Sequence, residues 1–141
     1  MTRWVIDASV AVKWFLPLRQ EEPNHAEALQ ILDVMARGDA ECYQPPHFIA
    51  EVLGVLARLR PEKAQANLGD LLNMDFQGVE MAPVYVVACD LSIQLKHHLF
   101  DTLYHAVALN TSDAILITAD ETYYRKAQHL GCIQRLQDYV A

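Results

Sequence analysis

Two short apolar runs in the sequence end at an aspartate and pass directly into a helical pattern. The first is WVID at 4–7, with a predicted helix at 8–16 that ends before Pro17. The second is ILITAD at 115–120, with a predicted helix at 121–130. Runs that are apolar at successive positions are typical of strands buried on both faces, and such strands occur in parallel sheets covered by helices. The chain is therefore expected to be an α/β protein.

The rest of the chain continues this alternation of strands and helices. Apolar spacing, glycines and prolines predict helices at 23–37, 47–59, 61–74, 84–98 and 101–110, and strands near 42–43 and at 78–82. This order predicts a three-layer α/β/α sandwich around a small central parallel sheet. Because no repeat or linker interrupts it, residues 1–141 are expected to form one domain.

Composition excludes several other classes of protein. Hydrophobic residues make up 52% of the chain and charged residues 21%, which is typical of a globular domain. Cysteines 42, 89 and 132 form no CxxC pair, so neither disulfides nor a thiolate zinc site are expected. The neighbours His97 and His98 lack the spacing that places two rings on one helix face, and no histidine metal site is expected. Without a signal peptide or a long apolar run, we expect a soluble cytoplasmic protein that does not contact the membrane.

Four carboxylates stand at positions where a site could form. Asp7 and Asp120 follow predicted strands, and Asp101 lies at a predicted helix start. Each of the three could simply be a helix N-cap. However, the carboxyl ends of parallel strands are also where functional sites assemble in open α/β sheets.

Glu51 lies on the border of the apolar face of the helix at 47–59. A carboxylate partly removed from water needs compensation by a cation or by hydrogen-bond donors. One candidate cation is Arg58, two helical turns further on, and the other is a metal ion. Hard divalent cations such as Mg²⁺ prefer oxygen ligands, and the four carboxylates together would suit one or two of them.

The net charge of −7 argues against a protein that binds nucleic acid by neutralising many phosphates. Bound Mg²⁺ would change this locally, because it would make the acidic cluster a positive site that polarises a phosphoryl oxygen and activates water. The acidic composition is therefore compatible with a nucleic-acid substrate.

Four segments carry a resemblance to a known family. In chain order they are VIDASVAVKWF, PPHFIAEVLGVLAR, FDTLYHAVAL and LITADETYYRKA. Together they resemble the PIN-domain ribonucleases, and most closely the VapC toxins of toxin–antitoxin pairs, over essentially the whole chain. The resemblance implies an endoribonuclease that depends on Mg²⁺, or on Mn²⁺ in its place, and cleaves RNA by in-line attack of metal-activated water.

The resemblance also implies roles for individual residues. Asp7 and Asp101 match direct metal ligands, whereas Glu51 and Asp120 match acids that act directly, through waters or on a second ion. Two hydroxyl residues match positions that hydrogen-bond the carboxylates or a metal-bound water, namely Ser9 and Thr118. Two further positions match the family but are explained as well by core packing and a solvated lysine, namely Tyr104 and Lys13.

The chain also departs from the family. An asparagine often follows the glutamate by three residues, and here that position is Gly54. Asp113 has no counterpart and is interpreted as a loop residue before the strand. Since the four acids are intact, catalytic competence is expected.

Partners are predicted partly from basic residues and partly from the resemblance. Five bases could contact RNA or form a solvated face: Arg58, Arg60, Lys63, Arg125 and Lys126. The resemblance implies a VapB-type antitoxin in a groove near the site, with the helices at 23–37 and 47–59 as candidates, and a homodimer.

Two other functions are alternatives to the ribonuclease. A phosphatase with Asp7 as nucleophile would normally use Asp-x-Asp, and the second position here is Ser9. A PIN-like module that binds RNA or a partner without cutting it is disfavoured by the intact set of four acids.

Overall fold

The computed structural model describes residues 1–17 and 23–141, which form five strands, seven α-helices and three short 3₁₀ helices. In chain order these are β1 (Thr2–Ile6), α1 (Ala8–Ala11), η1 (Val12–Trp14), α2 (His25–Ala36), β2 (Ala40–Gln44), α3 (Phe48–Leu59), α4 (Ala64–Leu72), β3 (Phe76–Gly78), α5 (Ala82–Leu95), α6 (Leu99–Leu109), β4 (Ala114–Thr118), α7 (Glu121–Ala127), η2 (Gln128–Leu130), β5 (Ile133–Arg135) and η3 (Leu136–Asp138). Within this described part of the chain, none of the helices is both long and apolar enough to cross a membrane.

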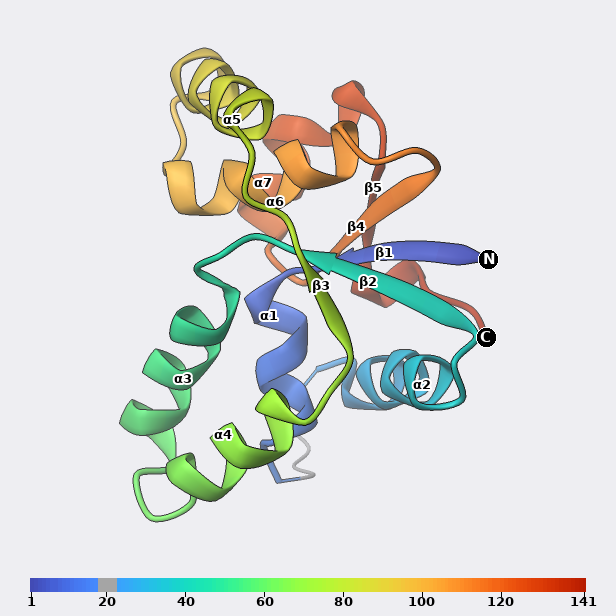
Figure 1. The fold of residues 1–141 in the computed structure, drawn as a ribbon, viewed down its shortest axis with the longest axis vertical. Helices are drawn as coiled ribbons and strands as arrows, with labels where there is room; N and C mark the ends of the chain where they lie inside the picture. Colours follow the sequence, from blue (N-terminus) through green and yellow to red (C-terminus); the bar gives the residue numbers. More distant parts are fainter. Residues whose placement is uncertain (18–22) are drawn as a thin grey trace.

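The strands form one parallel sheet in the order β3-β2-β1-β4-β5. Figure 1 shows α5, α6 and α7 on one side of the sheet and α1 to α4 on the other. The predicted three-layer α/β/α sandwich is therefore confirmed. Strand order reverses between β1 and β4, and ligands of such sheets bind beyond the carboxyl ends of the strands at this kind of reversal.

Several predicted boundaries were wrong. The strand predicted at 78–82 is β3 at Phe76–Gly78, and α5 already begins at Ala82 because Pro83 favours the first turn of a helix. The helix α6 begins at Leu99, so Asp101 lies in its first turn and is not its N-cap. The helix predicted at 8–16 is only the short α1 followed by η1. The strand β5 was not predicted at all.

The two central strands are held at their carboxyl ends by more than the backbone ladder. Val5 and Ile6 are fully buried, as expected for strands covered on both faces. The buried side chain of Gln44 continues the pairing past the last backbone partners of β1 and β2, Trp4 and Cys42. Its Oε1 accepts from the Ile6 N–H at 2.7 Å, and its Nε2 donates to the Ile6 carbonyl at 2.8 Å. On the other side, the Asp7 N–H donates to the Ile117 carbonyl at 3.0 Å. The position of Asp7 is therefore fixed from both neighbouring strands.

Candidate functional site

Asp7 follows β1 directly and is largely buried, with 9% of its surface exposed. It is the N-cap of α1, as the cap interpretation predicted, and its Oδ2 accepts from the Ser9 N–H at 3.0 Å and from the Ser9 hydroxyl. The Ser9 Oγ also accepts from the Ala119 N–H at 3.0 Å. Ser9 thereby connects the carboxylate at the end of β1 to the chain that leaves β4.

Asp120 has the equivalent place after β4. It is the N-cap of α7, and its Oδ1 accepts from the Tyr123 N–H at 3.0 Å. The buried Thr118 hydroxyl accepts from the Asp120 N–H at 3.0 Å. Thr118 therefore holds the backbone of Asp120, and Asp120 lines the cavity described below.

Glu51, in the first turn of α3, is compensated by neighbours that the sequence did not indicate. Tyr104 donates its hydroxyl to Glu51 Oε1 at 2.7 Å, and His47 Nε2 lies 3.3 Å from the same oxygen. Burial alone would raise the pKa of Glu51, but these hydrogen bonds outweigh it and lower that pKa. Across residues 1–17 and 23–141 no ion pair joins Arg58 to Glu51, so the first of the two predicted cations is not its partner.

Asp101 also has a histidine beside it. His97 Nε2 lies 2.7 Å from Asp101 Oδ2. Ligand atoms of His97, Asp101 and Asp120 all lie within 4.8 Å of one another, which is close enough to hold one metal ion. The sequence prediction that no histidine metal site is present compared His97 with His98 and did not consider the i, i+4 spacing from His97 to Asp101.

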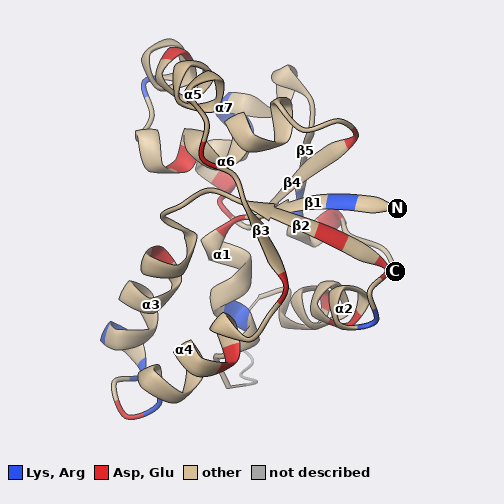
Figure 2. Cartoon of the chain, viewed as in Figure 1, with Lys and Arg blue, Asp and Glu red and all other residues tan. Residues whose placement is uncertain are grey.

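All four predicted acids line one cavity of about 540 Å³ at the reversal of strand order. Its lining is Asp7, Ala8, Ser9, Val12, Ala50, Glu51, Gly54, Val55, Arg58, Asp101 and Asp120. Figure 2 shows acidic positions where α1, α3 and α6 approach the ends of the strands. Four separate segments of the chain thus bring carboxylates to one place.

The pKa of the Asp7 carboxyl is strongly raised, first by burial and then by the neighbouring acids. Burial raises the pKa of Asp7 to about 7; the two hydrogen bonds from Ser9 oppose this rise, and the charges of Asp101 and Glu51 add to it. Such a cluster of four carboxylates, one buried and three partly buried, fits a hard divalent cation, whose charge would offset both burial and mutual repulsion. Burial and the same acids raise the pKa of Tyr104, whose phenol therefore stays a neutral donor.

A family model described as the PIN domain matches residues 4–128. The chain belongs to the PIN domain family. No curated protein sequence matches this PIN domain significantly.

Three solved structures share its fold at low sequence identity. The structure of VapBC2 from Rickettsia felis bound to a promoter DNA fragment has a TM-score of 0.67 at 14% identity, with 95% of this chain and 98% of that chain covered. FitAcB from Neisseria gonorrhoeae has a TM-score of 0.66 at 16% identity, covering 96% and 99%. VapBC-1 from nontypeable Haemophilus influenzae has a TM-score of 0.67 at 13% identity, covering 97% and 100%. At these identities the likeness shows the fold alone.

The five predicted basic residues of this PIN domain differ in whether they line the acidic cavity. Among the described residues that line the acidic cavity, Arg58 is the one base. Arg60 instead donates through Nη1 to the Phe15 carbonyl at 2.5 Å. Lys126 donates to the Lys96 carbonyl at 3.2 Å and contacts His97 Nδ1 at 3.2 Å. The last two of the five predicted bases, Lys63 and Arg125, are exposed and also do not line the cavity.

The structure also gives the surroundings of Lys13, Gly54 and Asp113. Lys13 is buried and donates to the Pro23 carbonyl at 2.9 Å, so it is not the solvated lysine that was one explanation of it. Gly54 lines the cavity, and a β-carbon there would have no heavy atom within 4 Å. Asp113 lies in the turn before β4, as expected.

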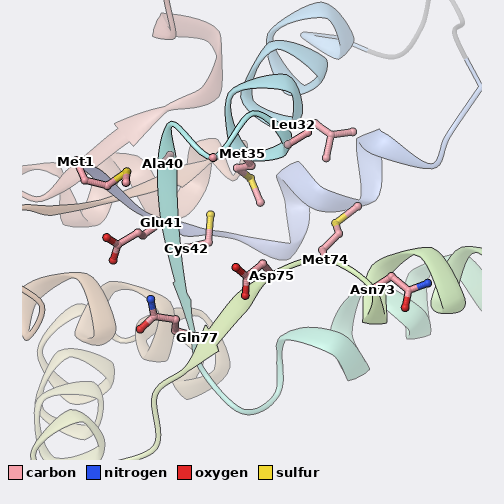
Figure 3. A pocket seen from close by; sticks show the side chains of 12 residues that line it. Met1, Leu32, Met35, Ala40, Glu41, Cys42, Asn73, Met74, Asp75 and Gln77 are labelled. Atoms are coloured by element: carbon pink, nitrogen blue, oxygen red, sulfur yellow. The ribbon is translucent and has the colours of Figure 1, made fainter.

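A second cavity of about 650 Å³ lies between α2, β2 and β3, near the amino ends of the strands, and none of the four acids lines it. Figure 3 shows Met35, Met74 and Cys42 among the side chains that line it. Burial, with a contribution from Asp75, raises the pKa of the Cys42 thiol to about 12, which keeps it protonated. This cavity therefore offers packing surface but no activated nucleophile.

Proposed function

We propose that this PIN domain is a divalent-metal-dependent endoribonuclease. The observation that carries the proposal is that four carboxylates from four segments line one cavity at the strand reversal, with Arg58 beside them. Asp7 and Asp101 would hold the cation directly, and Glu51 and Asp120 would complete the site directly, through water or on a second ion. When bound, Mg²⁺ or Mn²⁺ would supply a Lewis acid and lower the pKa of water to give a nucleophile.

Residues of the protein itself would hold the carboxylates in position and contact the RNA. Ser9 holds the Asp7 carboxylate through two hydrogen bonds, and Tyr104 and His47 hold Glu51 as an anion. Arg58 would contact a phosphate of the RNA at the open side of the cavity. Because the cavity is acidic, RNA would approach it only after the carboxylates have been neutralised by the cation.

Incubation of the purified protein with a mixture of structured and single-stranded RNAs tests this proposal. Cleavage is expected with Mg²⁺ or Mn²⁺, and it should be lost in EDTA and in the variants Asp7→Asn and Asp101→Asn. Asp113→Asn is the matched control, because it makes the same substitution at an exposed turn residue. Equal cleavage by the wild type and both site variants would contradict the proposal. RNA binding without any cleavage would favour the non-catalytic alternative.

We further propose that the nuclease is a VapC-type toxin in the cytoplasm and that a VapB-type antitoxin restrains it. The resemblance of the four segments to VapC toxins and the shared fold with two VapBC structures support this role. The antitoxin would occupy a groove near the acidic cavity, for which the helices α2 and α3 are candidates, and the toxin would form a homodimer. Expression alone should arrest growth, and co-expression of the product of a short neighbouring gene should relieve the arrest. Undisturbed growth on expression of a cleavage-competent protein would contradict the toxin role.

A further inference from the structure

Hydrogen-bond chemistry fixes which nitrogen of His97 carries the hydrogen. Lys126 Nζ lies 3.2 Å from His97 Nδ1, and an ammonium group can only donate. Nδ1 must therefore accept, so the hydrogen of a neutral ring is on Nε2. Nε2 faces Asp101 Oδ2 at 2.7 Å and donates to it. Lys126, His97 and Asp101 thus form a directed chain of donors that ends on a carboxylate of the cavity.

This chain of donors excludes His97 as a metal ligand, which is the simplest interpretation of a histidine beside the acids. A metal-binding imidazole would have to present the lone pair of Nε2 to the ion, and its hydrogen would then be on Nδ1. The Nδ1–H and the Lys126 ammonium would face each other as two donors at 3.2 Å. The proximity of His97 to Asp101 and Asp120 therefore does not make it a ligand.

The surroundings hold the His97 ring in this orientation. Its side chain is only 8% exposed, and the Tyr123 ring packs against it edge-on, with 4.9 Å between ring centroids. Tyr123 is itself anchored, because its hydroxyl donates to His105 Nδ1 at 2.8 Å. His105 accepts there since its Nε2–H donates to the Gly131 carbonyl, also at 2.8 Å. The ring of His97 is thus part of a buried, hydrogen-bonded frame.

The backbone of His97 is fixed as well. Its N–H donates to the Ser92 carbonyl at 3.1 Å, and the Ser92 hydroxyl donates to the His97 carbonyl at 2.5 Å. Lys96, in the left-handed conformation with φ of 52°, makes the turn that ends α5 and brings His97 back over this helix end. Both the backbone and the ring are therefore held before any ion or RNA binds.

We infer that His97 is a positioning residue, which orients the Asp101 carboxylate for a divalent cation by donating to one oxygen and is not itself a ligand. The inference rests on the proposed metal-dependent function. It deepens that function, because it leaves an all-oxygen set of ligands and so favours Mg²⁺ and Mn²⁺ over zinc. Donors of this kind typically contribute 10- to 100-fold to metal affinity.

Two substitutions separate the hydrogen bond from the packing. His97→Phe keeps an aromatic ring against Tyr123 but removes the donor, whereas His97→Gln keeps an N–H near the position of Nε2 but removes the ring. The affinity for Mn²⁺ in solution should fall about tenfold or more in His97→Phe and stay nearer the wild type in His97→Gln. Unchanged affinity in His97→Phe, or a larger loss in His97→Gln, would overturn the inference. Thermal unfolding of each variant shows that it is folded.

Lys126→Met tests the outer end of the chain of donors. Arg125→Met is its matched control, since it removes the same charge from an exposed neighbour on α7. Mn²⁺ affinity should fall more in Lys126→Met than in Arg125→Met. Equal affinities in the two variants would contradict the assigned role of Lys126.

Spectroscopy of bound Mn²⁺ tests the role of His97 without reference to activity. Electron spin echo envelope modulation of the wild type should show no coupling from a coordinated histidine nitrogen. Such a coupling, if His97→Phe removed it, would make His97 a ligand and overturn the inference while the metal site stood. Failure of the wild type to bind Mn²⁺ more tightly than Asp101→Asn would instead overturn the proposed function and this inference together.

Discussion

At the scale of single residues, the energetic penalty of bringing the acids together falls mainly on Asp7. The carboxylate is buried beside two other acids, and burial first of all raises its pKa to about 7. Its capping role alone does not require this, because an exposed aspartate or asparagine caps a helix equally well. Above about pH 7 the metal-free protein therefore carries an unfavourable charge on Asp7 that a bound cation would offset.

The pH dependence of stability follows from this pKa. The folded metal-free chain keeps a proton on Asp7 up to about pH 7, whereas the unfolded chain releases it near the ordinary value of 3.8. Stability should therefore fall as pH rises between these values, by up to about 4 kcal/mol at about 1.4 kcal/mol per pKa unit. Asp7→Asn keeps a capping side chain and cannot ionise, so at pH 8 without metal it should be more stable than the wild type.

Urea unfolding from pH 4 to pH 8, with and without Mg²⁺, measures this difference. Mg²⁺ should stabilise the wild type but not Asp7→Asn. Asp113→Asn, at an exposed turn residue with φ of 59° that asparagine tolerates, should behave like the wild type. A wild type as stable as Asp7→Asn at pH 8 in EDTA would refute the account of Asp7.

The hydroxyl of Tyr104 is expected to contribute more than an ordinary surface hydrogen bond. It is buried and donates to Glu51 at 2.7 Å, so Tyr104→Phe should lower the free energy of unfolding by about 1–2 kcal/mol. It should also raise the pKa of Glu51, because it removes one of the hydrogen bonds that lower it. The control Tyr85→Phe loses an exposed bond to Glu80 at 3.1 Å. Equal denaturation midpoints for the two variants would argue against this role.

At the scale of elements, the sequence is most informative where burial dictates the pattern. The apolar runs of β1 and β4 identify central strands, and the aspartates after them identify the end of the sheet where the four acids line one cavity. The edge strands β3 and β5 are only three residues long, with sequences FQG and IQR. Their pairing comes from neighbouring strands and not from their own pattern, so sequence reasoning misplaced one and missed the other.

Gly54 makes the helix α3 less stable than alanine would at the same position. Glycine in a helix interior costs roughly 1 kcal/mol relative to alanine, and a β-carbon here would meet no heavy atom within 4 Å. Gly54→Ala should therefore raise the free energy of unfolding by up to about 1 kcal/mol. Gly38→Ala, with equal space but a φ of +78°, should destabilise the protein. Chemical denaturation compares the two, and a stability loss in Gly54→Ala would contradict this explanation.

At the scale of the whole molecule, the site exists only because the topology brings four segments together. Sequence spacing could place each acid at the end of a strand or on a helix border, but their meeting in one cavity depends on the reversal between β1 and β4. The histidines were missed for a related reason. His47 and His97 each lie beside the carboxylate four residues after them, and neither pairing has an apolar pattern to signal it.

The net charge of −7 should make RNA binding depend on the cation. At near-physiological salt in EDTA, fluorescence anisotropy of a labelled RNA should show little binding, because the acidic cavity repels phosphates. Addition of Ca²⁺, which neutralises carboxylates but supports hydrolysis poorly, should promote binding to the wild type and not to Asp101→Asn. Equal affinity with and without a divalent cation would show that RNA binds elsewhere.

The most direct test of the central claim is the anomalous diffraction of crystals soaked in Mn²⁺. The account predicts a manganese peak in the cavity at coordination distance from Asp7 and Asp101, with His97 donating to Asp101 and lying outside the coordination shell. A cavity that stays empty at saturating Mn²⁺, or a peak bound by other residues, would contradict it.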